Sequence, residues 1–171
     1  MPAGLETDNY KWYPVYTFSR SEKAACQALV KKGIEVYLPL QRQLKQWTDR
    51  KKWVEEPLIK SYLFVRIKEN EQTEVLMTKG IARFIFFSGK VASMPDRQIN
   101  ELKLLMSSAV DLEITSDDLQ PGERVIVKAG PLKGLIGEIV SYRSQKQLAL
   151  RLENLGYTII VYMAPALLNR Y

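Results

Sequence analysis

The sequence has no histidine and only one cysteine, and these two shortages exclude much of enzyme chemistry. Without an imidazole, general acid–base catalysis loses its commonest group, and Ser-His or Cys-His nucleophile pairs cannot form. One cysteine and no histidine also argue against a structural zinc site. Cys26 lies among alanine, leucine and valine at helical spacing, so we expect an inert buried thiol. The composition predicts a protein that is not an enzyme and holds no metal or cofactor.

Phosphate-binding and membrane signals are also missing from the sequence. It contains neither G-x-x-x-x-G-K-[ST] nor G-x-G-x-x-G, the glycine-rich phosphate loops. No apolar run approaches the roughly 20 residues of a membrane helix. The N-terminus lacks the basic-then-apolar pattern of a signal peptide. We therefore expect a cytoplasmic protein without a membrane partner.

Charge is unevenly distributed along the chain, which carries a net charge of +6. Residues 108–119 contain four acidic residues and no basic one, whereas the segments on either side are basic. An acidic spacer between two basic blocks predicts two domains that each act near a polyanion.

Residues 1–9 are expected to be disordered, and residues 10–107 are expected to form an α+β domain. Strands are predicted over 11–18, 34–38, 58–67 and 83–87 with 90–94. Ser19 to Glu22 match the capping box S-x-x-E of a helix that ends at Gly33. Asn70 can cap a second helix, and Pro95-Asp96 opens a third. The order β-α-β-β-α-β predicts a ferredoxin-like α/β sandwich with a four-stranded antiparallel sheet, from which residues 41–57 extend as a hairpin or loop.

Residues 108–120 are expected to form an acidic flexible linker, and residues 121–171 a small all-β domain. Strands are predicted at 124–128, 135–142, 147–152 and 157–163. In the run PGERVIVKAGPLKGLIGEIV, closely spaced glycines interrupt two β-branched segments. Glycines supply positive φ and close backbone approach, which the corners of a small bent barrel require. The pattern predicts an SH3-like barrel.

That glycine-rich run resembles the KOW motif of proteins that act on RNA, ribosomes or RNA polymerase. Further runs are Trp12-Tyr13, Tyr62-Leu63-Phe64-Val65, Gly80-Ile81 with Phe84, and Met94-Pro95. Together they resemble the NusG family of transcription elongation factors, in which an N-terminal NGN domain precedes a KOW domain. The segment from Lys31 to Leu58 is most similar to the specialised RfaH and UpxY paralogues, the latter associated with surface-polysaccharide operons. Lys60-Ser61 stands where general factors usually carry Pro-Gly, which favours a specialised paralogue.

The resemblance implies a bacterial, nucleoid-associated, monomeric factor that binds RNA polymerase and suppresses pausing or termination. The family's docking patch for the β-prime clamp helices would comprise Tyr16, Ile59, Tyr62, Phe64, Phe87 and Ile99. Core packing is the alternative for Phe64 and Ile99. Thr73, with Gln72, would approach the β-subunit gate loop. The rival function is a ribosome- or RNA-binding KOW protein without polymerase contact, which the aromatic strand of the first domain disfavours.

Nucleic acid is the second expected partner. Cations attract phosphates and indoles stack on exposed bases, so the run from Gln41 to Trp53 is a candidate for either. Its candidate residues are Arg42, Lys45, Trp47, Arg50, Lys51, Lys52 and Trp53. The alternative is a solvated hairpin whose indoles fold back onto it. The resemblance adds Arg20, Lys23 and Lys79, and it implies non-template DNA or nascent RNA as the ligand.

The resemblance also implies a protein partner for the KOW domain, either a small-subunit ribosomal protein or the termination factor Rho. The matching loop residues are Leu132, Leu135 and Leu155. Burial at the ends of the barrel is the alternative for these leucines. Some RfaH-type barrels refold into a helical hairpin. Here four glycines in the segment oppose a helix, since each costs about 1 kcal/mol relative to alanine.

Overall fold

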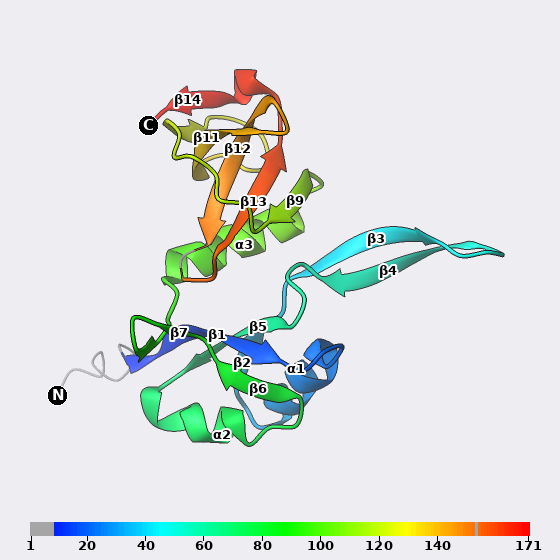
Figure 1. Cartoon of the computed structure of the whole chain (residues 1–171), viewed down its shortest axis with the longest axis vertical. Coiled ribbons are helices and arrows are strands. Elements are labelled where there is room, and N and C mark those ends of the chain that lie inside the picture. Colours follow the sequence, from blue (N-terminus) through cyan, green and yellow to red (C-terminus); the bar gives the residue numbers. More distant parts are fainter. Residues whose placement is uncertain (1–8, 153) are drawn as a thin grey trace. The chain divides into compact units, whose positions relative to one another are not determined.

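The computed structural model describes residues 9–152 and 154–171, and the chain divides into two compact units, residues 1–99 and residues 100–171. Each unit contains an antiparallel sheet (Figure 1). Residues 1–8 of the segment expected to be disordered lie outside the described residues.

The first unit is built on a four-stranded sheet in the order β2-β5-β1-β6. Its elements are β1 (Lys11–Thr17), α1 (Glu22–Lys31), β2 (Glu35–Tyr37), β3 (Leu40–Gln46), β4 (Lys51–Pro57), β5 (Tyr62–Ile67), the 3-10 turn η2 (Glu69–Glu71), α2 (Gln72–Leu76), β6 (Ile81–Phe84), β7 (Phe86–Phe87) and β8 (Lys90–Val91). Within the sheet, the elements follow the predicted order β-α-β-β-α-β. The helix α3 (Asp96–Ser107) crosses the boundary between the units.

One face of this sheet forms the core of the first unit. Side chains alternate across a strand, so Val15, Leu63 and Val65 share a face. They are fully buried together with Leu29 of α1 and Val75 of α2, and both helices lie on this side of the sheet (Figure 1). The opposite face carries the intervening aromatic side chains of β1 and β5.

The predicted capping box at the start of α1 is wrong. The helix begins at Glu22 after an N-cap, Ser21, whose side chain makes no capping hydrogen bond. The Glu22 carboxylate instead accepts a hydrogen bond at 2.9 Å from the backbone N–H of Ser61. Ser61 adopts a left-handed φ of 66°, a conformation that favours glycine. Glu22 therefore stabilises the turn at Ser61 and does not cap its own helix. Asn70 is also not the cap of α2, because the N-cap residue of that helix is Glu71.

Residues 40–57 form the predicted hairpin. β3 and β4 pair only with each other and extend away from the four-stranded sheet (Figure 1). Every residue from Arg42 to Trp53 is exposed. At the base, the Nζ of Lys23 donates to the carbonyl of Glu55 at 2.6 Å, and the Leu58 N–H donates to the Pro39 carbonyl at 2.8 Å. The hairpin is thus anchored to the first unit only at its base.

The second unit contains a six-stranded antiparallel sheet in the order β14-β10-β11-β12-β13-β9. Its elements are β9 (Asp111–Thr115), β10 (Arg124–Val127), β11 (Ile136–Tyr142), β12 (Gln145–Leu152), β13 (Tyr157–Tyr162), the 3-10 turn η3 (Pro165–Leu167) and β14 (Leu168–Arg170). The four strands predicted here are present with ends shifted by one or two residues. Two further strands, β9 and β14, complete the sheet.

Strand β9 lies inside the segment expected to be a flexible linker. It pairs with β13 over five residues, so that Glu113 lies opposite Ile160. Beyond β9, the Leu119 carbonyl accepts a hydrogen bond at 2.7 Å from Arg151 of β12. The expected linker is therefore part of the second unit, because its backbone and an acidic side chain find partners there.

Two glycines of this unit are required by close backbone approach. A Cβ at Gly137 would lie 2.6 Å from the carbonyl oxygen of Ala149 on the neighbouring strand. A Cβ at Gly122 would collide with the carbonyl oxygen of Ile139. The predicted reason for glycine in this run is thus confirmed at these two positions.

Candidate interaction surfaces

Tyr16 and Tyr62 form an aromatic pair on the sheet face opposite the core of the first unit. They lie opposite each other on β1 and β5, and their rings meet edge to face with centroids 5.4 Å apart. The guanidinium of Arg83, on β6, lies 5.2 Å from the centroid of the Tyr16 ring. Both tyrosines are half-buried. This tyrosine pair, with its cation, offers a preformed aromatic surface.

Three other residues predicted for the same patch lie in the interior. Ile59 is 3% exposed, and Phe64 and Ile99 are fully buried. Phe64 stacks on Tyr37 with ring centroids 6.4 Å apart. Ile99 shares a buried helix face with Leu102 and Leu105, three and six residues further on. Their assignment to an exposed patch is a correction to the sequence interpretation: packing accounts for all three.

Phe87 and Thr73 are exposed, but at separate places. Phe87, 58% exposed, lies in the short β7–β8 hairpin beside Phe86, which is 61% exposed. Thr73 lies in the first turn of α2, on the helical side of the sheet. The neighbouring Gln72 is half-buried. Thr73 therefore lies on a different side of the unit from the tyrosine pair.

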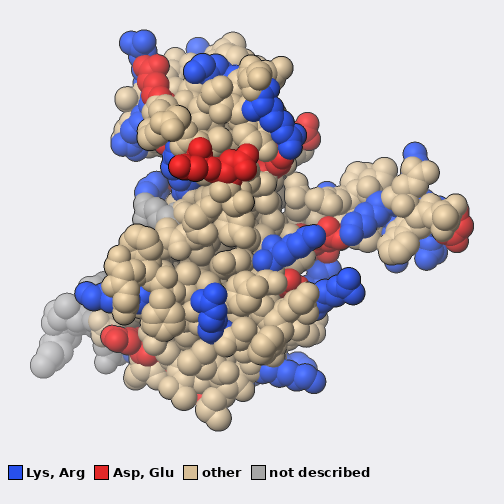
Figure 2. Space-filling view, in the orientation of Figure 1, with Lys and Arg blue, Asp and Glu red and all other residues tan. Residues whose placement is uncertain are grey.

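The hairpin presents its cations and indoles to solvent. Trp47 and Trp53 are 54% and 55% exposed, and Lys and Arg side chains are distributed along the hairpin (Figure 2). The Arg42 guanidinium lies 5.0 Å from the Trp53 ring centroid, and Lys45 forms an ion pair with Glu56. The two indoles are not buried against the hairpin. The alternative, a solvated hairpin whose indoles fold back onto it, is therefore not supported.

The three cations added by resemblance differ in their surroundings. Arg20, Lys23 and Lys79 are all exposed. Lys23 is engaged at the base of the hairpin by its bond to the Glu55 carbonyl. Arg20 and Lys79 lie in adjacent turns, which the hydrogen bond from Phe18 N–H to the Gly80 carbonyl holds together at 3.0 Å. These two cations remain available to an anionic ligand.

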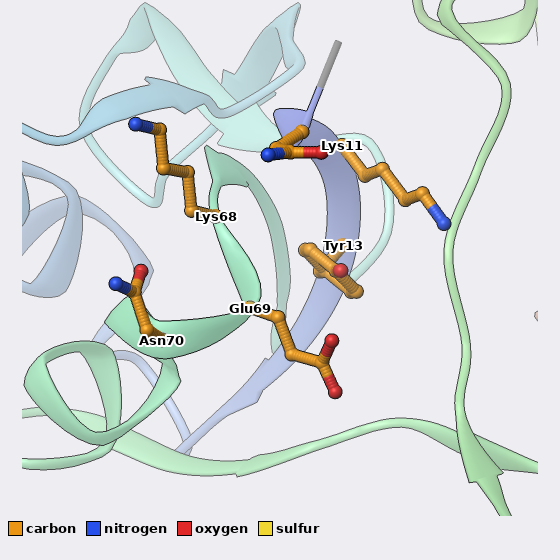
Figure 3. A pocket seen from close by; sticks show the side chains of 6 residues that line it. Lys11, Tyr13, Lys68, Glu69 and Asn70 are labelled. Carbon is orange, nitrogen blue, oxygen red and sulfur yellow. The ribbon is translucent and has the colours of Figure 1, made fainter. Parts of the chain in front are cut away.

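A polar hollow lies between β1 and the turn that follows β5 (Figure 3). It is lined by Asn9, Lys11, Tyr13, Lys68, Glu69 and Asn70, none of which was predicted as a site residue. Burial, together with the negative charge of Glu69, raises the pKa of Tyr13. Lys11 and Lys68 extend to different sides (Figure 3). The charged groups do not converge, so we assign no ligand to this hollow.

Two of the three leucines predicted for partner binding are buried in the second unit. Leu132 is 2% exposed and Leu135 is 3% exposed. A turn in which the Leu135 N–H donates to the Leu132 carbonyl at 3.0 Å directs both side chains inward. The burial alternative is correct for this pair. Leu155, in the turn between β12 and β13, is half-buried.

Glu113 is the centre of a polar cluster that the sequence did not reveal. Its carboxylate accepts hydrogen bonds from the hydroxyls of Tyr142 and Tyr162 and from the guanidinium of Arg143, each at 2.8 Å. The two tyrosine hydroxyls, with Arg143, lower the pKa of Glu113. The same hydrogen bonds raise the pKa of both tyrosines. The partners lie 29 to 49 residues away in sequence, so no local pattern could have indicated them.

Metal and membrane features were sought in the described part of the chain. Residues 9–152 and 154–171 contain no group of three or more Cys, Asp or Glu placed to bind a metal ion. Among their helices, none combines the length and apolar character needed to cross a membrane.

Comparisons with known proteins identify the class of protein. The family model described as transcription termination factor NusG matches residues 10–103, more than half of the chain. A solved structure of Thermotoga maritima NusG is similar over 94% of this chain and 97% of that one, with 17% identity and a TM-score of 0.54. A structure of the MjSpt4:Spt5 complex matches over the same shares at 17% identity with a TM-score of 0.29. The family model thus defines a transcription factor. The chain belongs to the NusG family.

Proposed function

We propose that this chain is a specialised NusG paralogue of the RfaH and UpxY kind. It binds RNA polymerase at the β-prime clamp helices and suppresses pausing or termination on particular operons, such as polysaccharide loci. The observation that carries the proposal is the tyrosine pair, which is accessible, preformed and separate from the core of its own unit.

Docking through the tyrosine pair follows from its chemistry. Aromatic side chains bring large contact area at low entropic cost and dominate many protein interfaces. The half-buried rings of Tyr16 and Tyr62 can pack against an apolar helical surface, while Arg83 supplies a neighbouring cation. Phe87 extends the contact, and Thr73 approaches the gate loop from the other side of the unit. Bound in this way, the factor would hold the clamp closed without making or breaking a bond.

The second unit completes the proposal as a KOW domain. We assign the NGN domain to residues 10–107 and the KOW domain to residues 121–171, to which β9 (Asp111–Thr115) adds a strand. The six-stranded sheet would close into an SH3-like barrel. The partner is a small-subunit ribosomal protein or Rho. Because Leu132 and Leu135 are buried, Leu155 is the leucine left to contact it.

Nucleic-acid binding by the first unit is the third component. The exposed hairpin, with Arg20 and Lys79, would contact non-template DNA or nascent RNA. Its cations supply salt-dependent phosphate attraction. Such contacts would add to polymerase docking through effective concentration, since both sites lie on one unit.

The test is a pair of substitutions in the full-length chain. Tyr16→Ala with Tyr62→Ala should abolish binding to a reconstituted elongation complex and restore pausing at a defined site. Phe18→Ala is the matched control, because it removes an aromatic side chain that is 59% exposed and lies outside the proposed patch. Thermal unfolding verifies that the variants remain folded. Normal polymerase binding by the folded double variant would refute docking through the tyrosine pair. A wild-type chain that binds ribosomes but not polymerase would favour the rival KOW function.

A further inference from the structure

The β3–β4 hairpin has two chemically different faces. Directly paired residues share a face, so Leu44 and Trp53 lie together, and Lys45 and Lys52 lie on the other side. The Trp47 N–H donates to the Arg50 carbonyl at 2.7 Å, which extends the ladder by one further pair. The stacked face consists of Arg42, Leu44, Gln46, Lys51, Trp53 and Glu55. The polar face consists of Gln41, Gln43, Lys45, Trp47, Arg50, Lys52, Val54 and Glu56.

The arrangement of charges on the polar face destabilises the hairpin itself. Lys45 lies directly opposite Lys52, and like charges in direct cross-strand pairs are destabilising. Lys45 is compensated by Glu56. Within the described residues, Arg50 and Lys52 lie in no ion pair, and from Arg42 to Trp53 the sequence contains five basic residues against Asp49 alone. An anionic ligand would relieve this repulsion.

The two-stranded shape of the hairpin fits some forms of nucleic acid better than others. It is a two-stranded ribbon without a third strand, with seven residues in each strand, or about 23 Å of length at 3.3 Å per residue. The major groove of B-DNA is about 12 Å wide and admits a two-stranded ribbon, whereas that of A-form RNA is too narrow to be read. A single strand would stack successive bases on neighbouring aromatics, but Trp47 and Trp53 lie on opposite faces.

We propose that the hairpin docks in the major groove of duplex DNA with its polar face toward the base edges. This rests on the nucleic-acid role of the hairpin in the proposed function, names duplex DNA as its ligand in place of a single strand, and is independent of polymerase docking. Arg50 and Lys52 reach phosphates or guanine edges, and Gln43 supplies an amide that can pair with adenine. The stacked face, where Arg42 already covers Trp53, is directed away from the bases.

The experiment measures fluorescence anisotropy of labelled oligonucleotides with the full-length chain. The probes are a 20-base-pair DNA duplex, its single strand and the matching RNA duplex. Arg50→Gln with Lys52→Gln removes two charges from the polar face. Arg42→Gln with Lys51→Gln removes two charges from the stacked face and is the matched control. We expect the wild type to prefer duplex DNA and the polar-face variant to lose roughly 10-fold or more in affinity. Its salt slope should fall by about two, with a smaller loss in the control.

A second measurement tests the groove itself. Bulky substituents at the C5 position of pyrimidines fill the major groove, so they should weaken DNA binding by the wild-type chain. They should leave the residual DNA affinity of the polar-face variant unchanged, because its groove contacts are already lost. Equal losses in the two charge variants, tighter binding to single-stranded DNA or RNA duplex, or indifference to the C5 substituents would each overturn the proposal. The Tyr16→Ala, Tyr62→Ala variant should bind DNA like the wild type, so failure of polymerase docking and failure of groove binding are separately visible.

Discussion

The β3–β4 hairpin and strand β9 are two polar segments that differ in strand pairing and in exposure. The hairpin pairs only with itself and is exposed on both faces. Strand β9 joins a six-stranded sheet and is half-buried over four of its five residues. Both lie in stretches whose sequence lacks a strong core pattern. Burial therefore does not follow from polarity alone.

The difference lies in whether the charged side chains find partners. Glu113 in β9 accepts three hydrogen bonds from two tyrosines and an arginine, and charge-assisted hydrogen bonds of this kind are the stronger ones. In the hairpin, Lys45 pairs with Glu56, but Lys52 faces Lys45 across the ladder and Arg50 lies at the exposed tip, and neither of these two forms an ion pair within the described residues. A charged segment packs into the fold where it is compensated, and it remains available to a ligand where it is not.

Replacing the acid in each segment tests this comparison with the largest expected effect. Glu113→Ala should lower the free energy of unfolding of the second unit by about 1–3 kcal/mol, because two tyrosine hydroxyls and Arg143 lose their acceptor. Glu55→Ala in the hairpin removes a carboxylate that is exposed and should leave unfolding unchanged. Urea denaturation, followed by near-ultraviolet circular dichroism, measures both. Equal effects would contradict the comparison.

Removing single donors should have a smaller effect. Tyr142→Phe and Tyr162→Phe each delete one hydroxyl that donates to Glu113 at 2.8 Å. Each should cost about 1 kcal/mol in the free energy of unfolding. In a Glu113→Gln background the loss should shrink, since the charged acceptor is already gone. Full additivity across this double-mutant cycle would show that the hydroxyls act independently of Glu113.

The pairing of β9 should depend on pH at both extremes. The pKa of Glu113 is lowered in the folded state, so its contribution is present above the ordinary carboxyl pKa and is lost as pH falls through the folded value. The pKa of Tyr142 and Tyr162 is raised, so their contribution is present below the ordinary phenol pKa and is lost as pH rises through the folded values. Amide exchange of β9 at several pH values, with Glu113→Gln as control, measures this. Hairpin amides should show no matching change in protection.

Trimming the exposed indoles should have the smallest effect on stability. Trp47→Ala and Trp53→Ala each remove a side chain that is more than half exposed. The melting temperature should shift by no more than about 2 °C, because surface substitutions outside packed features have little effect. Differential scanning calorimetry gives the shift. A drop of many degrees would mean that the hairpin is part of the packed structure after all.

Local patterns determined much of this protein. Strand periodicity indicated β1, β5 and four strands of the second unit, and Pro95-Asp96 marked the start of α3. The polar, basic composition of residues 41–57 indicated an extended hairpin or loop, and the structure has the hairpin. These features depend on spacings within a short window, where backbone geometry and turn chemistry act. The composition also predicted a protein that is not an enzyme, and this stays a prediction.

Tertiary structure alone decided which side chains are available. Leu132 and Leu135 look like loop residues in the sequence, yet they are buried. Glu22 looks like part of a helix cap, yet it holds Ser61, 39 residues away. Glu113 lies in an acidic stretch that resembles a linker, and its donors come from β11, β13 and the turn after β11. Such partners are distant in sequence, and they meet only when the chain folds. The chain then supplies hydrogen bonds that no local window contains.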